Sequence, residues 1–173
     1  ATKQTTVSLQ PADGTTAVGV GTTYEVVVDN AQGGVGAAEV RVAIDNTTTA
    51  AITDGDVVGE NVAKEIEVAT DGSYADIEYA LADTDDTGSV VVATVTVEGS
   101  SAGTANLSVG PTNGNNAILV FDETGQGYTV AGTSGADLEV QAVQFLVDDL
   151  DAPDKAAIGG SATVTATVTN NGS

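Results

Sequence analysis

The sequence predicts an all-β protein, a jelly-roll β-sandwich of about nine strands with an extra C-terminal β-strand as a tail. Three observations support this prediction. Short segments alternate apolar and polar residues with the period of two that is typical of strands. Valine and threonine dominate these segments, and glycine, aspartate and asparagine separate them. No segment of useful length has the roughly 3.6-residue period of a helix.

The first half of the chain holds the most regular strand patterns. The first predicted strand, residues 5–10, is ended by Pro11 and by a turn at Asp13-Gly14, because proline lacks a backbone donor and Asp-Gly favours tight turns. The cleanest alternation, at residues 38–45, follows a glycine-rich turn. Further strands in this half are expected at residues 24–29, within 50–58, at 65–68 and at 74–81.

The second half continues the pattern with five predicted strands, at residues 91–98, 105–109, 118–121, 128–130 and 138–147. An acidic and glycine-containing stretch follows, and residues 162–169 then alternate strongly again. We therefore predict a sandwich over residues 1–146, a linker over 147–161 and a lone C-terminal strand over 162–173.

The charge of the chain excludes several classes of function. Twenty-five carboxylates face four basic side chains, so the net charge is −21. Nucleic acids and anionic membranes need a basic surface, so neither is expected as a partner, and no apolar run is long enough to span a membrane. The chain lacks histidine, cysteine, methionine and tryptophan, which removes the imidazole and thiolate that most catalytic sites use. We therefore predict that the protein is not an enzyme.

The acidic composition also indicates an environment. Concentrated salt or multivalent cations relieve the repulsion among like charges, so a salt-rich surrounding and a calcium-loaded extracellular protein both fit. The carboxylates are spread along the chain, lysine is rare and the apolar residues are mostly small, a composition that resembles surface proteins of halophilic archaea. Three sequons, at Asn46, Asn106 and Asn171, favour an extracellular or cell-surface glycoprotein.

Three parts of the chain resemble the cohesin family. Residues 34–45 are similar to its glycine-containing turn, alternating strand and final aspartate. Residues 80–97 are similar to its loop before a Gly-x-hydrophobic-Ala-Thr strand, with Val97 in place of the usual aromatic residue, and residues 121–140 resemble its final turns and last strand. The resemblance covers residues 4–142 and implies a nine-stranded jelly roll, related in shape to some carbohydrate-binding modules. Family members are non-catalytic extracellular receptors, typically for dockerin modules.

The C-terminal segment resembles the opening of a CARDB-type, Ig-like adhesion module, which needs several more strands than the chain contains. A lone amphipathic strand is not stable in water, so we expect it to pair with a sheet edge of its own sandwich or of a neighbouring subunit. The acidic linker and the glycines before the strand favour the neighbouring subunit. Val164, Ala166 and Val168 are the predicted assembly residues.

One stretch of the sequence has a partial calcium-loop pattern. Asp83, Asp85 and Asp86 lie just before Gly88, as in the first half of an EF-hand loop. The twelfth position, where a glutamate is needed, holds Thr94 inside a predicted strand. A solvated acidic turn is therefore the favoured interpretation. We predict no cofactor, with Ca²⁺ as the one candidate ion.

Two other groups of residues could carry chemistry. Glu65 and Glu67 share a strand face, and so do Asp76 and Glu78, so either pair could in principle serve a glycosidase. In a chain with 25 carboxylates such pairs arise by chance, and a charged solvent-facing surface is the favoured interpretation. Tyr74, on the same face as Asp76 and Glu78, is the best candidate for a sugar platform.

These observations lead to two hypotheses of function. The first is an extracellular structural or adhesive protein that assembles with copies of itself into a pilus-like filament by β-strand addition, because a heterologous contact that does not close makes open filaments. The alternative is a cohesin-type binding module that recognises a dockerin-like partner or a polysaccharide. A carboxylate-dependent glycosidase would require two facing acids in a deep cleft.

Overall fold

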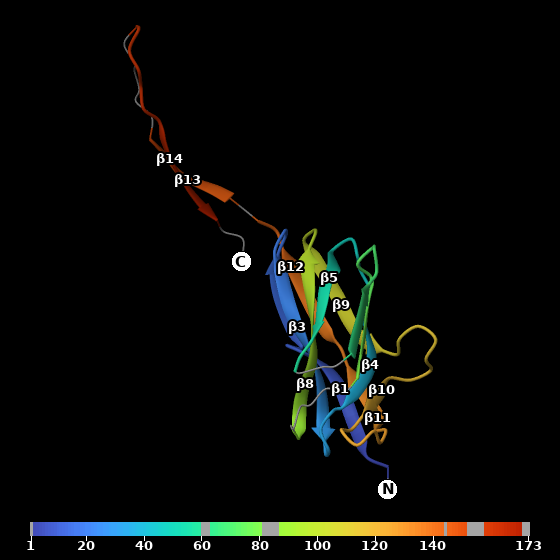
Figure 1. The fold of residues 1–173 in the computed structure, drawn as a ribbon. Coiled ribbons are helices and arrows are strands. Elements are labelled where there is room, and N and C mark those ends of the chain that lie inside the picture. Colours follow the sequence, from blue (N-terminus) through green and yellow to red (C-terminus); the bar gives the residue numbers. More distant parts are fainter. Residues whose placement is uncertain (1, 60–62, 81–86, 144, 152–157, 171–173) are drawn as a thin grey trace.

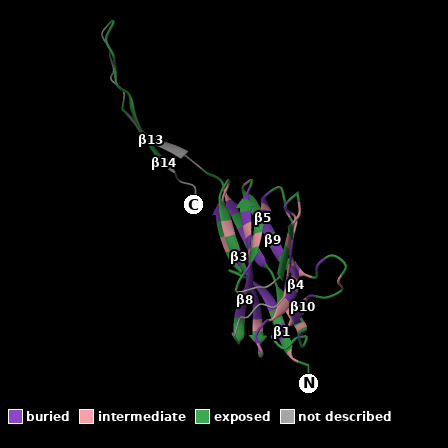
Figure 2. Cartoon of the chain, viewed as in Figure 1, coloured by how far each residue is buried: buried purple, intermediate pink, exposed green. Residues whose placement is uncertain are grey.

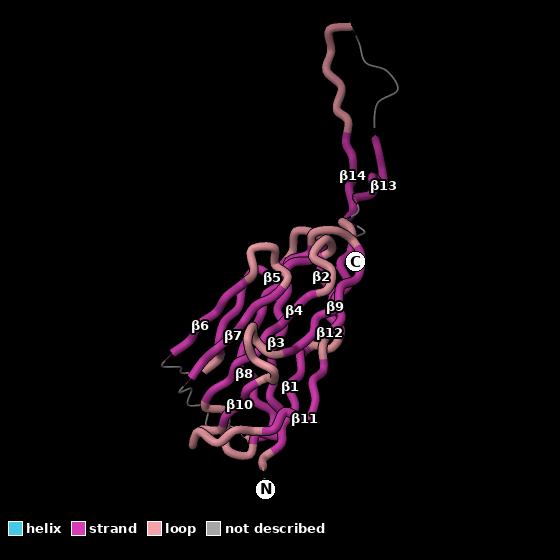
Figure 3. Tube along the Cα trace, turned by 90° about the vertical axis from the view of Figure 1, so that its right-hand side faces the viewer, coloured by secondary structure: helices cyan, strands magenta, loops and turns pink. Residues whose placement is uncertain are grey.

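The computed structural model describes residues 2–59, 63–80, 87–143, 145–151 and 158–170. Within these residues the chain forms strands and no helix, so they contain no helix that could cross a membrane. Five strands form one sheet, seven form a second sheet and two form a separate ribbon. The two large sheets pack face to face as a sandwich (Figures 1 and 3), which confirms the predicted fold class.

The five-stranded sheet has the order β11-β1-β3-β8-β5. Its strands are β11 (Thr129–Ser134), β1 (Gln4–Gln10), β3 (Gly21–Ala31), β8 (Gly88–Gly99) and β5 (Ala50–Val57). Neighbouring strands are antiparallel except β1 and β11, which run parallel. The strands β11 and β5 are therefore the two edges of this sheet.

The seven-stranded sheet has the order β2-β12-β9-β4-β7-β6, and a short strand, β10, also pairs with β4. Its strands are β2 (Asp13–Ala17), β12 (Ala136–Gln141), β9 (Gly103–Gly110), β4 (Ala37–Ile44), β7 (Tyr74–Ala80), β6 (Ala63–Val68) and β10 (Leu119–Phe121). The strand β10 pairs with the first part of β4 and β9 with the last part. Only β2 and β12 run parallel.

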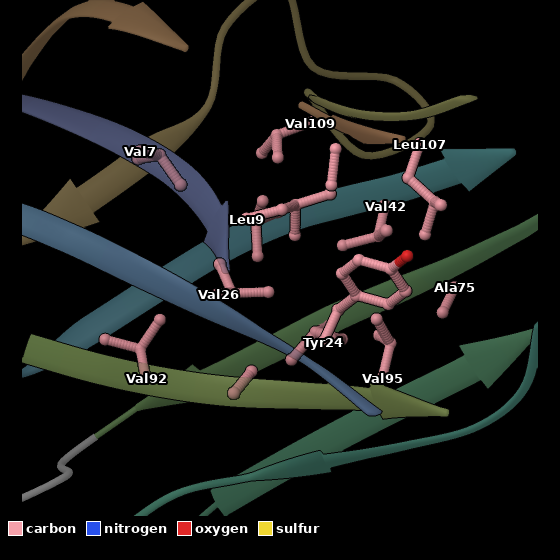
Figure 4. Packing of buried hydrophobic residues seen from close by; sticks show 14 of the residues in the cluster. Val7, Leu9, Tyr24, Val26, Val42, Ala75, Val92, Val95, Leu107 and Val109 are labelled. Carbon is pink, nitrogen blue, oxygen red and sulfur yellow. The ribbon is translucent and has the colours of Figure 1, made fainter. Parts of the chain in front are cut away.

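The core lies between the two sheets, where Figure 2 shows the buried residues in purple, and valine is its most frequent residue. Strand β4 illustrates how alternation builds it, because Val40, Val42 and Ile44 point inward and are at most 6% exposed. Side chains from both sheets meet in Figure 4, where Leu9 and Val42 come from opposite layers. Burial of each such side chain stabilises the fold by about 1.5–3 kcal/mol, so the valine-rich inner faces hold a sandwich that has no disulfide.

Tyr24 is the largest of the fully buried side chains and links the two sheets across the core. It belongs to β3, and its hydroxyl donates a 3.0 Å hydrogen bond to the backbone oxygen of Asp137 on β12. Burial raises the pKa of Tyr24 to about 12, so the phenol stays neutral. Gly14 on β2 leaves room for this ring, because a Cβ there would overlap the Tyr24 hydroxyl.

Between β11 and β12 the chain passes from the five-stranded sheet to the seven-stranded sheet within a single residue, Gly135. A Cβ on Gly135 would overlap the carbonyl oxygen of Leu107 on β9. The backbone at this sharp crossing therefore contacts the backbone of β9 directly, so only glycine fits at position 135.

The turn between β10 and β11 is organised by the carboxylate of Asp122, whose side chain is fully buried. One oxygen accepts a hydrogen bond from Lys3 Nζ at 2.6 Å, and the other accepts bonds from Thr124 and from the backbone nitrogen of Gln126. The Lys3 ammonium is the largest of several hydrogen-bonding influences that hold the pKa of Asp122 far below its ordinary value. This contact fastens the N-terminal segment to the turn.

The C-terminal strand is not alone. Strand β14 (Thr165–Asn170) pairs antiparallel with β13 (Phe145–Asp151), and Val168 lies opposite Val147. The two-stranded ribbon projects beyond the end of the sandwich where β12 ends (Figures 1 and 3). The prediction of a lone strand was therefore wrong, because β13 lies partly inside the predicted linker. The predicted domain limits, residues 1–146, 147–161 and 162–173, otherwise stay a prediction.

Three details of the strand prediction also differ from the structure. The predicted turn at Asp13-Gly14 is the start of β2, an edge strand whose mostly polar sequence carries no apolar alternation. The predicted strand at residues 138–147 is divided between β12 and β13. With β2 added, the described sandwich has more strands than the predicted nine, although the strands expected at residues 5–10, 24–29, 38–45, 65–68, 105–109 and 118–121 are present.

Replacement of Gly135 by alanine should destabilise the sandwich by on the order of 1–3 kcal/mol, because the new methyl group must displace a backbone oxygen. Gly132→Ala on the adjacent strand is the matched control, since its nearest atom would be a Thr6 methyl at 4.0 Å. Urea unfolding of both variants measures the difference. Equal stability of the two variants would contradict the tight corner.

The Asp122 contact predicts a specific loss of stability in acid. The pKa of Asp122 is depressed in the folded state, so its contribution is complete above about pH 5 and is lost as the pH falls through the ordinary aspartate value near 3.9 toward the folded value. Asp122→Asn should lower the melting temperature at pH 7, and the difference from the parent should narrow in acid. Asp54→Asn, at an exposed position on β5, is the control. A pH-independent difference would contradict this assignment.

Candidate functional site

The outer surface of β4, β7 and β6 carries six charged side chains close together. Strand register places the outward residues of the three strands in rows. We call this surface the β4–β7–β6 face, and it consists of Glu39, Arg41, Glu65, Glu67, Tyr74, Asp76 and Glu78. The alternation that buries Val40 and Ile77 on the inside turns these residues outward.

Arg41 is the centre of this face. Its Nε and Nη2 atoms donate hydrogen bonds of 2.6 and 2.7 Å to the two carboxylate oxygens of Asp76, which lies opposite on β7. The guanidinium carbon also lies 3.8 Å from the centre of the Tyr74 ring. The hydrogen bond to Asp76 is the main cause that raises the pKa of Arg41. The bidentate bond and the ring contact together hold the cation in one orientation.

Acidic side chains lie in rows on both sides of Arg41. Glu39, Glu78 and Glu65 lie opposite one another on β4, β7 and β6, and Glu67 lies opposite Asp76. Partial burial, followed by the negative charges of Glu39 and Glu65, raises the pKa of Glu78. Like charges that face each other across strands are destabilising, so this surface stores unfavourable electrostatic energy that a cationic partner would relieve.

The segment between β9 and β10 borders the same face. Asn115 donates a 2.6 Å hydrogen bond to Glu39 Oε2 and a 2.8 Å bond to Thr112, so the segment is fastened to β4. Asn113 and four of the acidic residues surround a shallow hollow of about 200 Å³. A second hollow of about 270 Å³ lies along β6 and β7 and includes Lys64.

These features describe a charged, open surface without a deep pocket among the described residues. Both acidic hollows are smaller than the roughly 300–1,000 Å³ that is usual for small-molecule sites. No group of three or more candidate metal ligands occurs among the residues that the structure describes. The carboxylates of Glu65 and Glu67 lie on an exposed edge strand, which is not the cleft that a glycosidase would require.

The structure brings the predicted carboxylate pairs and Tyr74 together on one face. Tyr74 is only half-exposed, however, and the Arg41 guanidinium covers its ring, so the ring is not an open platform for a sugar. The calcium candidates Asp83, Asp85 and Asp86 lie outside the described residues.

The remaining predicted sites lie elsewhere. Asn46 Nδ2 donates to Thr49 Oγ1 at 2.9 Å, and Asn106 Nδ2 donates to Asp45 Oδ2 at 3.0 Å on the exposed side of β9. Hydrogen bonds from Asn106, first from its backbone, lower the pKa of Asp45. Asn171 lies outside the described residues. Use of these sequons stays a prediction.

The predicted assembly residues Val164, Ala166 and Val168 are all exposed on the ribbon, with Val164 60% and Val168 55% accessible.

Arg41 and Asp122, which organise the two best-connected polar clusters, were not predicted from the sequence. Arg41 is the single arginine of the chain and lies in the most regular alternating strand, a signal that could have drawn attention to it. Asp122 has no comparable signal, because its charged partner, Lys3, is distant in sequence.

No protein-family model matches the chain, and no curated protein matches its sequence. Solved structures do match, and they include cohesins from an archaeon and from bacteria. A non-cellulosomal cohesin from the archaeon Archaeoglobus fulgidus is 16% identical with a TM-score of 0.57, and the match covers 79% of this chain and 91% of that one.

Two bacterial cohesins are similar to the same extent. A type I cohesin of Clostridium thermocellum, solved with a dockerin, is 10% identical with a TM-score of 0.61 and covers 82% and 96% of the two chains. The sixth cohesin of scaffoldin B from Acetivibrio cellulolyticus, also solved with a dockerin, is 15% identical with a TM-score of 0.60 and covers 80% and 99%. The chain therefore has the cohesin fold, as its sequence motifs suggested.

Glu78→Gln should stabilise the protein by on the order of 0.5 kcal/mol at neutral pH, because it removes one charge from a row of three. The pKa of Glu78 is raised in the folded state, so its ionisation destabilises the fold as the pH rises above the ordinary glutamate value. The gain should vanish in acid and shrink in concentrated salt. Glu25→Gln, on the exposed side of β3 with uncharged neighbours Gln10 and Thr94, is the control. A gain in stability that depends on neither pH nor salt would contradict the repulsion among these three glutamates.

Proposed function

We propose that this protein is a non-catalytic binding module of the cohesin type, which recognises a dockerin-like protein through its β4–β7–β6 face. The fold supports the class of function, since two of the similar cohesins were solved in complexes with dockerins. The observation that carries the choice of face is the fixed Arg41 guanidinium, stacked on Tyr74 and bound to Asp76.

Arginine and tyrosine are the side chains most enriched among the residues that dominate binding energy at protein interfaces. Arg41 keeps 25% of its side chain exposed, so a partner can reach it without breaking the bond to Asp76. Its fixed orientation reduces the entropy that binding would otherwise lose. The acidic rows around it favour a partner with lysine or arginine side chains and amide donors, and disfavour acidic competitors.

We also propose that the protein acts outside the cell. A cohesin-type receptor with a net charge of −21 and sequons suits the cell exterior of an organism in concentrated salt, where screening permits contacts between acidic surfaces. Recognition of a polysaccharide is less well supported, because Arg41 covers the best aromatic candidate, Tyr74. Filament formation by strand addition remains a separate hypothesis, and it concerns residues outside this face.

Reversal of one charge on the face should weaken the complex without disturbing the fold. Glu67→Lys changes an exposed residue on edge strand β6 and should raise the Kd for a dockerin-like partner about tenfold. Glu25→Lys, an equal charge change on the outer face of the other sheet, should leave the Kd unchanged. Calorimetric titration with purified dockerin-like modules from the same genome gives both values. Equal effects of the two variants would place the partner elsewhere, and absence of binding by every module would reject the proposal.

Arg41→Lys supplies a second readout on the same face. Lysine keeps the charge but cannot form the bidentate bond, so we expect weaker binding together with a loss of about 1–2 kcal/mol of stability. Comparison of the Kd at temperatures well below each melting point separates the two effects. Retention on insoluble polysaccharide, unaffected by either face variant, would favour the sugar-binding alternative.

A further inference from the structure

An apolar groove opens at the junction of the two sheets, with a lining that includes none of the residues of the β4–β7–β6 face. It has a volume of about 460 Å³ and lies between β9, β10 and β11. Val109, Ile118 and Leu119 form one wall, and Tyr128, Val130 and Thr133 form the other. The wall strands belong to different sheets, so the groove is a seam in the sandwich.

The groove is uncharged in a chain that carries 25 carboxylates. Residues 99–121 and 124–136, which supply every lining residue, contain no aspartate, glutamate, lysine or arginine. The other long uncharged segment of the chain is residues 156–173, which contains β14. The groove and strand β14 are thus the uncharged stretches at which copies of this protein can meet with the least like-charge repulsion, although β13, which pairs with β14, carries Asp148, Asp149 and Asp151.

Strand β11 is also the least protected edge of the sandwich. Natural edge strands are commonly guarded by charged residues, and the outer edges β2, β5 and β6 each contain at least one. Strand β11 contains none and pairs on one side with β1 only. Its edge away from β1 pairs with no other strand of this sheet among the described residues, so that edge can accept another strand.

Strand β14 has the properties of such an incoming strand. It alternates threonine with small apolar residues, and Val164 and Val168 are more than half exposed. Its sheet contains only β13 and β14 among the described residues, and a two-stranded ribbon is at best marginally stable in water. A third strand would stabilise the ribbon and bury the valines.

The positions of the added strand β14 and the receiving edge strand β11 favour a contact between two copies over a contact within one chain. The ribbon projects from the end of the sandwich where β12 ends, whereas β10, β11 and the N-terminus lie at the opposite end (Figures 1 and 3). A contact between opposite ends of two copies is heterologous, so it can repeat from copy to copy and gives an open filament where the rotation between copies does not close a ring.

We propose that β14 of one copy adds to edge strand β11 of a second copy and places Val164 or Val168 in the apolar groove, so that the protein associates head to tail. This proposal concerns a surface other than the dockerin-binding face, and its test uses the protein alone. Failure of one proposal therefore leaves the other standing.

Self-association is measured by sedimentation velocity over a concentration series in concentrated salt. Ala131→Asp on β11 and Val168→Asp on β14 should each weaken association about tenfold or more, because each buries a charge in the contact. Thr15→Asp, an exposed change on the other edge strand β2, should have no effect. Melting curves confirm that all three variants are folded. A chain that stays monomeric at every concentration, or association that survives both changes, overturns the proposal.

The contact itself can be tested by cross-linking, since the chain has no cysteine of its own. Isotope-labelled Val168→Cys protein is mixed with unlabelled Thr133→Cys protein under oxidation, and mixed disulfide dimers are identified by mass. We expect these dimers to form faster than those of Val168→Cys with Thr15→Cys. Equal rates for the two mixtures overturn the proposal. So does a chain carrying both Val168→Cys and Thr133→Cys that closes its own disulfide at high dilution.

Discussion

Two carboxylates are buried in the described part of this chain, and the structure depends on how each is paired. Asp76 is 7% exposed and Asp122 is 2% exposed, and an ionised group in either position would be strongly destabilising without a partner. The chain supplies Arg41 to the first and Lys3 to the second. One pair fastens β4 to β7 and the other fastens the N-terminal segment to the turn before β11. Two of the four cations are thus paired with these carboxylates, which leaves the rest of the surface strongly acidic.

Much of the fold follows from alternation, because burial of one face requires apolar side chains at every second position. Strand β4 could be predicted from Val40, Val42 and Ile44 alone. Strand β2 could not, since an edge strand buries too little to need an apolar pattern. The break between β12 and β13 could not be predicted either, because the apolar pattern of the sequence continues through the point where the chain leaves the sandwich.

The candidate site was less predictable than the fold. Its acidic residues could be placed on strand faces from the sequence, but their rows depend on the register between β4, β7 and β6, which pairs Arg41 with Asp76 across 35 residues. Register is set by the packing of inner faces, and no local signal encodes it. The groove depends on an even longer-range feature, the approach of β10 and β11 from different sheets.

Concentrated salt limits the kinds of contact that the two proposed binding surfaces of this chain can use. In molar salt the Debye length falls to about 3 Å, so long-range attraction by the acidic rows would no longer guide a partner. Contacts that remain effective are short bidentate bonds, such as those of Arg41, and burial of apolar surface, which strongly hydrated salts reinforce. An acidic protein in concentrated salt therefore needs binding surfaces that do not rely on net charge. The fixed guanidinium and the uncharged groove are the two places where this chain provides them.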